Sequence, residues 1–209
     1  MKSAKGKGFL LVLMDCPPHL EDEFNAWYDT EHIPERLAIP GFETGLRFVC
    51  LEGHPRYLAM YDLERPEVLE SAAYLKVGHD KASPWTKRVT SRVRVWRSAG
   101  RQVYPGNLVT RRAPRATLLR FRGRTADAES EIVKAARATF EDRPETLQAR
   151  VLAFETAGSV DYLVLVEARA AMAGQLDLAP FGRHAEALDM LNVYAPIEPG
   201  RLPPSSAGR

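Results

Sequence analysis

Apolar and polar positions follow two patterns along this chain, one typical of strands and one typical of helices. Residues 9–14 are continuously apolar, as in a strand that is covered on both faces. Residues 20–32 repeat apolar side chains at helical spacing. The face they form is made of Leu20, Phe24, Trp27, Tyr28, Glu31 and His32. Pro34 lacks a backbone N–H and disfavours helical geometry in the residue before it, so we expect the helix to end or kink just past His32.

The remainder of the first hundred residues predicts two further strands, a helix and a last strand. Alternation predicts strands at 42–51 and 57–63, separated by a hairpin turn at 52–55, and a short helical turn at 35–38. A helix is expected from Pro66 to about residue 76, followed by a half-exposed strand at 89–96. The order is therefore strand, helix, strand, strand, helix, strand.

The second half of the chain repeats this order. Strands are expected at 117–121, 147–154, 162–167 and 193–197, and helices at 126–140 and 181–191. A shift of 105 residues places Gly53 on Gly158, Tyr57 on Tyr162 and His79 on His184. The same shift places Arg137 where His32 stands, so the fold is repeated while the acid/base residues are not.

Glycine and proline between residues 98 and 116 indicate a connection between the two halves. We therefore expect an N-terminal unit at 8–99, which carries the site, and a degenerate C-terminal unit at 115–200. Residues 1–7 and 201–209 are expected to be loose, because they are rich in lysine, glycine, proline and serine.

Composition excludes several classes of function. The chain has 209 residues, 45% hydrophobic and 27% charged, as in soluble globular proteins, and its net charge of +2 is too small to suggest nucleic-acid binding. The early apolar run is too short to span a membrane. Cys16 and Cys50 lack the spacing of a zinc site or a disulfide scaffold, which favours a reducing cytoplasm. Phosphate-binding and metalloprotease motifs are absent from the sequence, so no metal or cofactor is predicted.

Two segments of the first half resemble a known family. Residues 23–34, EFNAWYDTEHIP, and residues 37–42, LAIPGF, resemble the first helix and second strand of EthD-like proteins in the dimeric α+β barrel superfamily. The resemblance covers roughly the first hundred residues. It implies a ferredoxin-like βαββαβ unit whose antiparallel sheet packs on a second sheet to close a barrel. The two units of this chain would then form an intramolecular α+β barrel, with a pocket between sheet and helices.

His32 is the leading catalytic candidate, because imidazole can accept and return a proton near neutral pH. Tyr28 lies one helical turn earlier on the same face and would donate a hydrogen bond to a developing oxyanion. Glu31 would orient the imidazole. Each residue also has a structural interpretation: a helix-end histidine, a core tyrosine and a surface carboxylate.

Three residues are predicted to bind substrate. Arg47 interrupts an apolar strand and would grip a carboxylate or phenolate, although an arginine at a strand edge is the alternative. Trp85 and Trp27 are expected to line the pocket. Asp29 falls off the helical face and is expected at the surface.

The predicted function is a cofactor-independent enzyme that moves a proton on a small apolar carbonyl or aromatic compound, in an isomerisation, dehydration or cyclisation. The superfamily, as the resemblance implies, includes cofactor-free cyclases, isomerases, small monooxygenases and haem proteins. Two alternatives are therefore open: a non-catalytic or stress-associated small-molecule binder, and a haem-binding protein. The expected partner is a small molecule rather than nucleic acid or membrane, and a homodimer is open.

Overall fold

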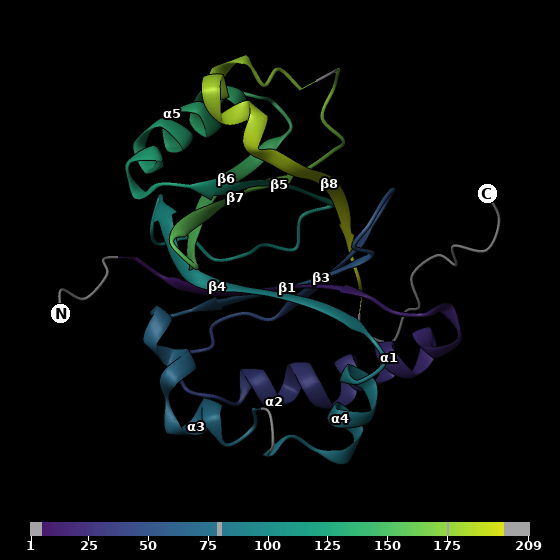
Figure 1. Cartoon of the computed structure of the whole chain (residues 1–209). Coiled ribbons are helices and arrows are strands. Elements are labelled where there is room, and N and C mark those ends of the chain that lie inside the picture. Colours follow the sequence, from purple (N-terminus) through teal and green to yellow (C-terminus); the bar gives the residue numbers. More distant parts are fainter. Residues whose placement is uncertain (1–5, 79–80, 175, 199–209) are drawn as a thin grey trace.

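Two α+β halves face each other through their sheets in the computed structural model, which describes residues 6–78, 81–174 and 176–198 (Figure 1). The first half contains β1 Gly8–Asp15, a 3₁₀ turn Pro18–Leu20, α1 Glu21–Trp27, a π-helical turn Tyr28–His32, α2 Ile33–Leu37, β2 Leu46–Cys50, β3 Tyr57–Leu63, a 3₁₀ turn Pro66–Glu70, α3 Ala72–Leu75, α4 Pro84–Thr90 and β4 Arg94–Tyr104. The second half contains β5 Arg115–Arg124, a 3₁₀ turn Ala126–Ala128, α5 Glu129–Phe140, β6 Thr146–Thr156, β7 Ser159–Ala168, 3₁₀ turns within Ala179–Ala187 and β8 Leu188–Pro196.

The strands of the described chain form a closed antiparallel barrel in the order β1-β3-β2-β8-β5-β7-β6-β4. Within the first half, β1 lies between β4 and β3, and β3 pairs with β2, which is the ferredoxin-like order. The second half repeats that order with β5 between β8 and β7. The two sheets join where β2 pairs with β8 and β4 pairs with β6. The predicted fold of two ferredoxin-like units in one barrel is confirmed.

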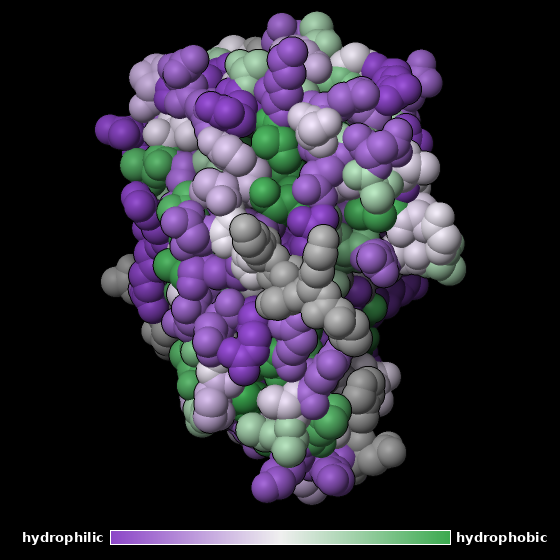
Figure 2. All heavy atoms as spheres, turned by 90° about the vertical axis from the view of Figure 1, so that its left-hand side faces the viewer, coloured by the Kyte–Doolittle hydropathy of each residue, from purple (hydrophilic) through white to green (hydrophobic). Residues whose placement is uncertain are grey.

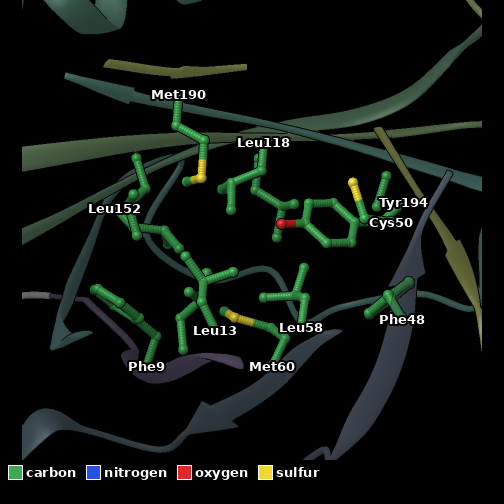
Figure 3. Packing of buried hydrophobic residues seen from close by; sticks show 14 residues of the cluster. Phe9, Leu13, Phe48, Cys50, Leu58, Met60, Leu118, Leu152, Met190 and Tyr194 are labelled. Carbon is green, nitrogen blue, oxygen red and sulfur yellow. The ribbon is translucent and has the colours of Figure 1, made fainter. Parts of the chain in front are cut away.

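The barrel interior is filled by side chains from both halves (Figure 3). Phe9, Leu11 and Leu13 of β1 point into it, while the intervening Leu10 and Met14 pack against the helices. This arrangement explains the continuous apolar run at the start of the chain, because both faces of β1 are covered. The residues labelled in Figure 3 include Phe9, Leu13, Leu58 and Met60 from the first half and Leu118, Leu152, Met190 and Tyr194 from the second.

Helices cover the outer face of each sheet. Helices α1 to α4 lie against the first sheet, and α5 lies against the second (Figure 1). The face of the molecule drawn in Figure 2 is mainly hydrophilic, with small separate apolar areas. In the described part of the chain, no helix has the length and apolar character needed to cross a membrane.

The predicted connection and the strand before it are partly wrong. Residues 84–90 form α4, with Ser83 accepting a hydrogen bond from the Thr86 amide at the helix start, and β4 follows to residue 104. Gly100, which the sequence places in the connection between the halves, lies within β4, where a Cβ would collide with the carbonyl oxygen of Ala153 on β6. The glycine is required by the seam between the halves.

Other predicted boundaries also differ. The helix expected from Pro66 is divided at Ser71, which accepts a hydrogen bond from the Tyr74 amide and begins α3. The strand expected at 42–51 narrows to β2, with Phe42 forming an isolated bridge to Leu63. The helix expected at 181–191 consists of 3₁₀ turns interrupted at Gly182, where φ is +49°, and its last residues begin β8.

The predicted repeat has structural counterparts. Gly53 and Gly158 both adopt positive φ in the turns before β3 and β7, and Tyr57 and Tyr162 are buried in those two strands. The aligned His79 lies outside the described residues. The expectation of a loose N-terminus is wrong for Lys7, whose backbone bonds to Gly106 and Gln102. Residues 1–5 and the predicted loose tail at 201–209 lie outside the described residues.

Candidate functional site

A cavity of about 340 Å³ lies between the outer face of the first sheet and helices α1, α2 and α4. Most of its walls are apolar. The described lining residues are Leu10, Val12, Met14, Phe24, Trp27, Tyr28, His32, Arg36, Tyr61, Tyr74, Val77, Gly78, Ala82, Thr86, Lys87, Val89, Thr90, Val93, Val95 and Arg97. Its volume is at the lower end of the range for small-molecule sites, about 300–1,000 Å³.

The π-helical turn Tyr28–His32 places the predicted acid/base residues on this cavity. The amide of Ile33 bonds to the carbonyl of Tyr28, five residues earlier, which is the wider register of a π-helix. We expected the helix to end or kink just past His32. It changes to π-helical geometry over Tyr28–His32 and then continues as α2, with Pro34 as the second residue of α2. His32 and Arg36 both line the cavity as a result.

His32 is held by aromatic rings and has an unusual electrostatic setting. Its ring centre lies 4.3 Å from that of Trp27 and 5.1 Å from that of Tyr28. Nδ1 is buried without a hydrogen-bond partner. Burial, followed by the positive charges of Arg36 and Arg47, lowers the pKa of His32 to about 3. The imidazole is therefore neutral at physiological pH.

Two tyrosines flank the imidazole. Tyr28 donates a hydrogen bond to Met14 Sδ at 2.8 Å, and burial raises the pKa of its phenol. Tyr61 of β3 has a buried hydroxyl without a partner, and its pKa is also raised, mainly by burial. Both phenols remain protonated at neutral pH and can act as hydrogen-bond donors. Tyr28 thus lies beside His32 as predicted, although its hydroxyl is already engaged with Met14.

The hydrogen bonds of Glu31 connect it to α4 and to Ser83, the residue before that helix. Its carboxylate accepts hydrogen bonds from Ser83 Oγ at 2.5 Å and from Thr86 Oγ1 at 3.0 Å. Thr86 in turn accepts a hydrogen bond from Trp27 Nε1 at 3.0 Å. Glu31 therefore ties α4 to the π-helical turn, and its hydrogen bonds go to α4 rather than to the imidazole of His32.

Arg47 connects β2 to the first helix. Its guanidinium is 6% exposed and donates to Asn25 Oδ1 at 2.5 Å and Asp29 Oδ1 at 3.0 Å. It also lies 4.3 Å from the ring centre of Tyr28. Arg47 is absent from the cavity lining and is neither at an exposed edge nor directed at a ligand. Asp29, expected at the surface, is instead the ion-pair partner of Arg47.

The two predicted tryptophans are separated. Trp27 is buried and lines the cavity, where it packs against His32. Trp85 does not line it. The indole N–H of Trp85 donates to Glu23 Oε1 at 3.2 Å and links α4 to α1 outside the cavity.

Arg36, Tyr61 and Arg97 line the cavity but were not among the predicted site residues. Arg36 follows His32 by four residues, and this spacing would have identified it if the helix had been expected to continue past Pro34. Tyr61 and Arg97 come from strands, and only the closed fold brings them to the cavity. In the described part of the chain, no group of three or more histidine, cysteine or acidic residues could hold a metal ion, and both Cys16 and Cys50 are free thiols.

Comparisons with known proteins show the fold. No protein-family model matches the chain, and no curated protein matches its sequence. A structure described as an anthrone oxidase-like protein aligns with a TM-score of 0.68 at 12% identity, covering 93% of this chain and 92% of that one. A structure described as a candidate monooxygenase from Lactobacillus acidophilus aligns at 0.55, with 10% identity and coverages of 92% and 93%. A chlorite dismutase variant from Candidatus Nitrospira defluvii aligns at 0.54, with 10% identity and coverages of 95% and 93%.

These matches span both halves, so the chain has the dimeric α+β barrel fold with its two ferredoxin-like units in one chain. Identities this low establish the fold alone. They do not distinguish an EthD-like protein from other proteins of the same fold.

The described residues do not fit a haem group. Haem iron commonly takes an axial histidine nitrogen. In the first half, the cavity beside His32 has a volume of about 340 Å³, and the imidazole packs between the rings of Trp27 and Tyr28, which leaves no place for a large planar macrocycle on the ring. In the second half, Nε2 of His184 lies 2.9 Å from Glu131, and Phe121 stacks on Phe181 with ring centres 4.6 Å apart beneath α5. We therefore derive no chemistry through haem.

Proposed function

We propose that this protein is an enzyme that removes and returns a proton on a small, largely apolar carbonyl or phenolic compound bound beside His32. The carrying observation is the neutral imidazole of His32, a residue that lines the cavity and whose Nδ1 has no hydrogen-bond partner. Among the described residues that line the cavity, there is no carboxylate, and both arginines and the lysine are cationic. His32 is therefore the side chain of this lining that can accept a proton at neutral pH.

The proposed step breaks a C–H bond next to a carbonyl. The proton moves to His32, and the electron pair left behind forms an enolate whose oxygen is negative. Return of the proton at another carbon gives isomerisation, whereas loss of hydroxide gives dehydration and attack on a second carbonyl gives cyclisation. Addition of dioxygen to the same carbanion, followed by protonation, would give a hydroperoxide. This last branch agrees with the descriptions of two structures that share the fold.

The low pKa of His32 arises from protein groups alone, namely burial and the charges of Arg36 and Arg47. An enolate formed next to the imidazole would supply a negative charge, which favours the protonated ring. The hydroxyl of Tyr61 and the guanidinium of Arg36 are the donors we assign to the enolate oxygen. Tyr28 stays a supporting residue, because its hydroxyl is engaged with Met14.

A non-catalytic binding protein is the second candidate function. The observation that favours it is the same pKa of about 3, because a base this weak contributes little to proton transfer unless a ligand raises its pKa. Catalysis and binding can be separated experimentally.

The test uses two carbon acids, anthrone and 2-tetralone, in deuterated buffer. We expect the full-length protein to accelerate exchange of their acidic protons, followed by NMR, while an oxygen electrode reports any uptake of dioxygen. His32→Gln should lower the exchange rate by about 10²–10⁴-fold. His19→Gln, at an exposed histidine, is the matched control and should exchange at the native rate.

Exchange at the native rate by His32→Gln would refute the proposal. Binding of these ketones by the native protein without any exchange would favour the non-catalytic candidate. Calorimetric titration of both proteins separates a loss of binding from a loss of proton transfer.

A further inference from the structure

The cavity has an uneven charge. Among its described lining residues, Arg36, Lys87 and Arg97 are basic and none is acidic. An apolar cavity with cationic groups and no lining carboxylate favours a ligand of opposite charge.

Arg36 is the buried member of this set. It is 6% exposed, and Nη1 donates to Glu35 Oε2 at 3.1 Å while Nη2 donates to the Val77 carbonyl at 3.3 Å. A guanidinium carries five N–H donors, so three of them have no hydrogen-bond partner among the described residues. Glu35, the one carboxylate paired with Arg36, does not line the cavity.

Two further residues of the cavity lining each have a buried polar atom without a partner. The hydroxyl of Tyr61 and Nδ1 of His32 are both buried and make no hydrogen bond. Buried polar atoms are normally satisfied, and leaving one unpaired is costly. A ligand oxygen would satisfy the Tyr61 hydroxyl. At the exposed side of the cavity, Arg97 Nη2 lies 3.4 Å from the hydroxyl of Tyr74, whose ring lies 5.5 Å from the Arg36 guanidinium.

We propose that the substrates of this cavity are aromatic or alicyclic compounds carrying an anionic group, a carboxylate or a phenolate, and that Arg36 is the residue that selects them. The planar guanidinium can donate two parallel hydrogen bonds to a carboxylate, which a lysine cannot do. This proposal rests on the proposed function, because it takes the cavity to be the substrate site. It extends that function by naming the chemical class of the substrate.

The test compares two probes of nearly equal shape, 2-naphthoate and neutral 2-naphthamide, by calorimetric titration of the full-length protein. We expect 2-naphthoate to bind about 10- to 100-fold more tightly, as for hydrogen bonds to charged groups. Arg36→Gln should reduce this ratio to nearly one by weakening naphthoate alone. Arg36→Lys should keep part of this affinity ratio, because lysine retains the positive charge but cannot donate two parallel hydrogen bonds.

Arg169→Gln, at an exposed arginine of the second half, is the matched control and should keep the native ratio. Circular dichroism verifies that each variant is folded. If Arg36→Gln does not fold, the binding ratio of Arg36→Lys is used to test the role of Arg36. Equal affinity of the native protein for the two probes would overturn selection by charge and leave proton transfer standing. A native ratio in Arg36→Gln would remove Arg36 from the role, and no binding of either probe would overturn the cavity as a site for such compounds.

The two proposals fail separately. His32→Gln should retain the preference for 2-naphthoate while losing proton exchange. Loss of exchange in His32→Gln with the ratio intact therefore supports both proposals. Equal binding of the two probes by a native protein that exchanges protons normally contradicts only the selection by charge.

Discussion

His32 shows how burial decides the chemistry of a single side chain. In the sequence it is an ordinary histidine near a proline. In the fold, the packed rings and two arginines hold it neutral far below the usual titration range of imidazole. The same burial leaves Nδ1 without a partner. A buried polar atom without a partner costs stability, which is why we interpret it as part of a binding site.

The pKa of His32 predicts how stability depends on pH. The unfolded chain protonates this histidine below its ordinary pKa of 6.5, whereas the folded protein does so only near 3. Its contribution is therefore complete above pH 6.5 and is lost as the pH falls toward 3. Between pH 7.5 and 5, urea unfolding of the native protein should lose about 2 kcal/mol relative to His32→Gln. His19→Gln should follow the native curve, and parallel curves for native and His32→Gln would contradict the lowered pKa.

Tyr61 and Tyr57 form a matched pair on β3. The Tyr61 hydroxyl is buried without a partner, whereas the Tyr57 hydroxyl donates to Glu21. Tyr61→Phe should therefore leave the free energy of unfolding equal or raise it by up to about 1 kcal/mol. Tyr57→Phe should lower it by about 1–2 kcal/mol. Denaturant unfolding of both variants measures this, and a larger loss for Tyr61→Phe would show that its hydroxyl serves folding rather than a ligand.

At the scale of elements, the first helix is held in place by side chains predicted to do chemistry. Arg47 ties β2 to α1 and the π-helical turn, and Glu31 ties α4 to that turn. Both residues support the walls of the cavity without lining it. Helical spacing correctly placed Tyr28 and His32 on the inner face. It placed Asp29 outside, because spacing alone does not reveal that a strand brings an arginine to it.

Substitution of Arg47 distinguishes support from substrate binding. Arg47→Met would remove the guanidinium that pairs with Asp29, hydrogen-bonds to Asn25 and lies over the Tyr28 ring. Breaking a buried ion pair in this way should lower the free energy of unfolding by about 3 kcal/mol. Arg94→Met, at an exposed position on β4, is the control and should change it by less than about 0.5 kcal/mol. Unchanged stability with weakened 2-naphthoate binding would restore Arg47 as a ligand-binding residue.

At the scale of the molecule, the sequence predicted the architecture because each half carries its own strong local pattern. The apolar run of β1 and the repeated order of elements are visible without a structure. The contacts between the two halves could not be predicted from the sequence, because they depend on residues whose type is typical of surface or linker positions. Gly100 and Arg150 are examples: the first lets β4 approach β6, and the second is a charged residue in a strand that also carries threonine, glutamine and glutamate, which suggests exposure. Arg150 is in fact 0% exposed.

Arg150 links the two halves through a buried charge network. Its Nη1 donates to Asp62 Oδ1 on β3 at 2.7 Å, and its Nη2 donates to Glu167 Oε1 on β7 at 2.9 Å and to Thr110 Oγ1 at 2.7 Å. Burial raises the pKa of Glu167 even with Arg150 present. Removal of the cation would leave two carboxylates close together in the barrel interior.

Arg150→Met should therefore lower the free energy of unfolding by about 3–5 kcal/mol. Without the cation, the folded-state pKa of Glu167 should lie further above the unfolded value, so protonation favours the folded variant and its deficit grows as the pH rises. Urea unfolding should show a smaller deficit at pH 5 than at pH 8, and the double variant Arg150→Met with Glu167→Gln should recover part of it at pH 8. A deficit independent of pH, with no recovery in the double variant, would mean that Arg150 acts through packing rather than through charge. The joint between the two halves would then be held by the barrel strands and not by this network.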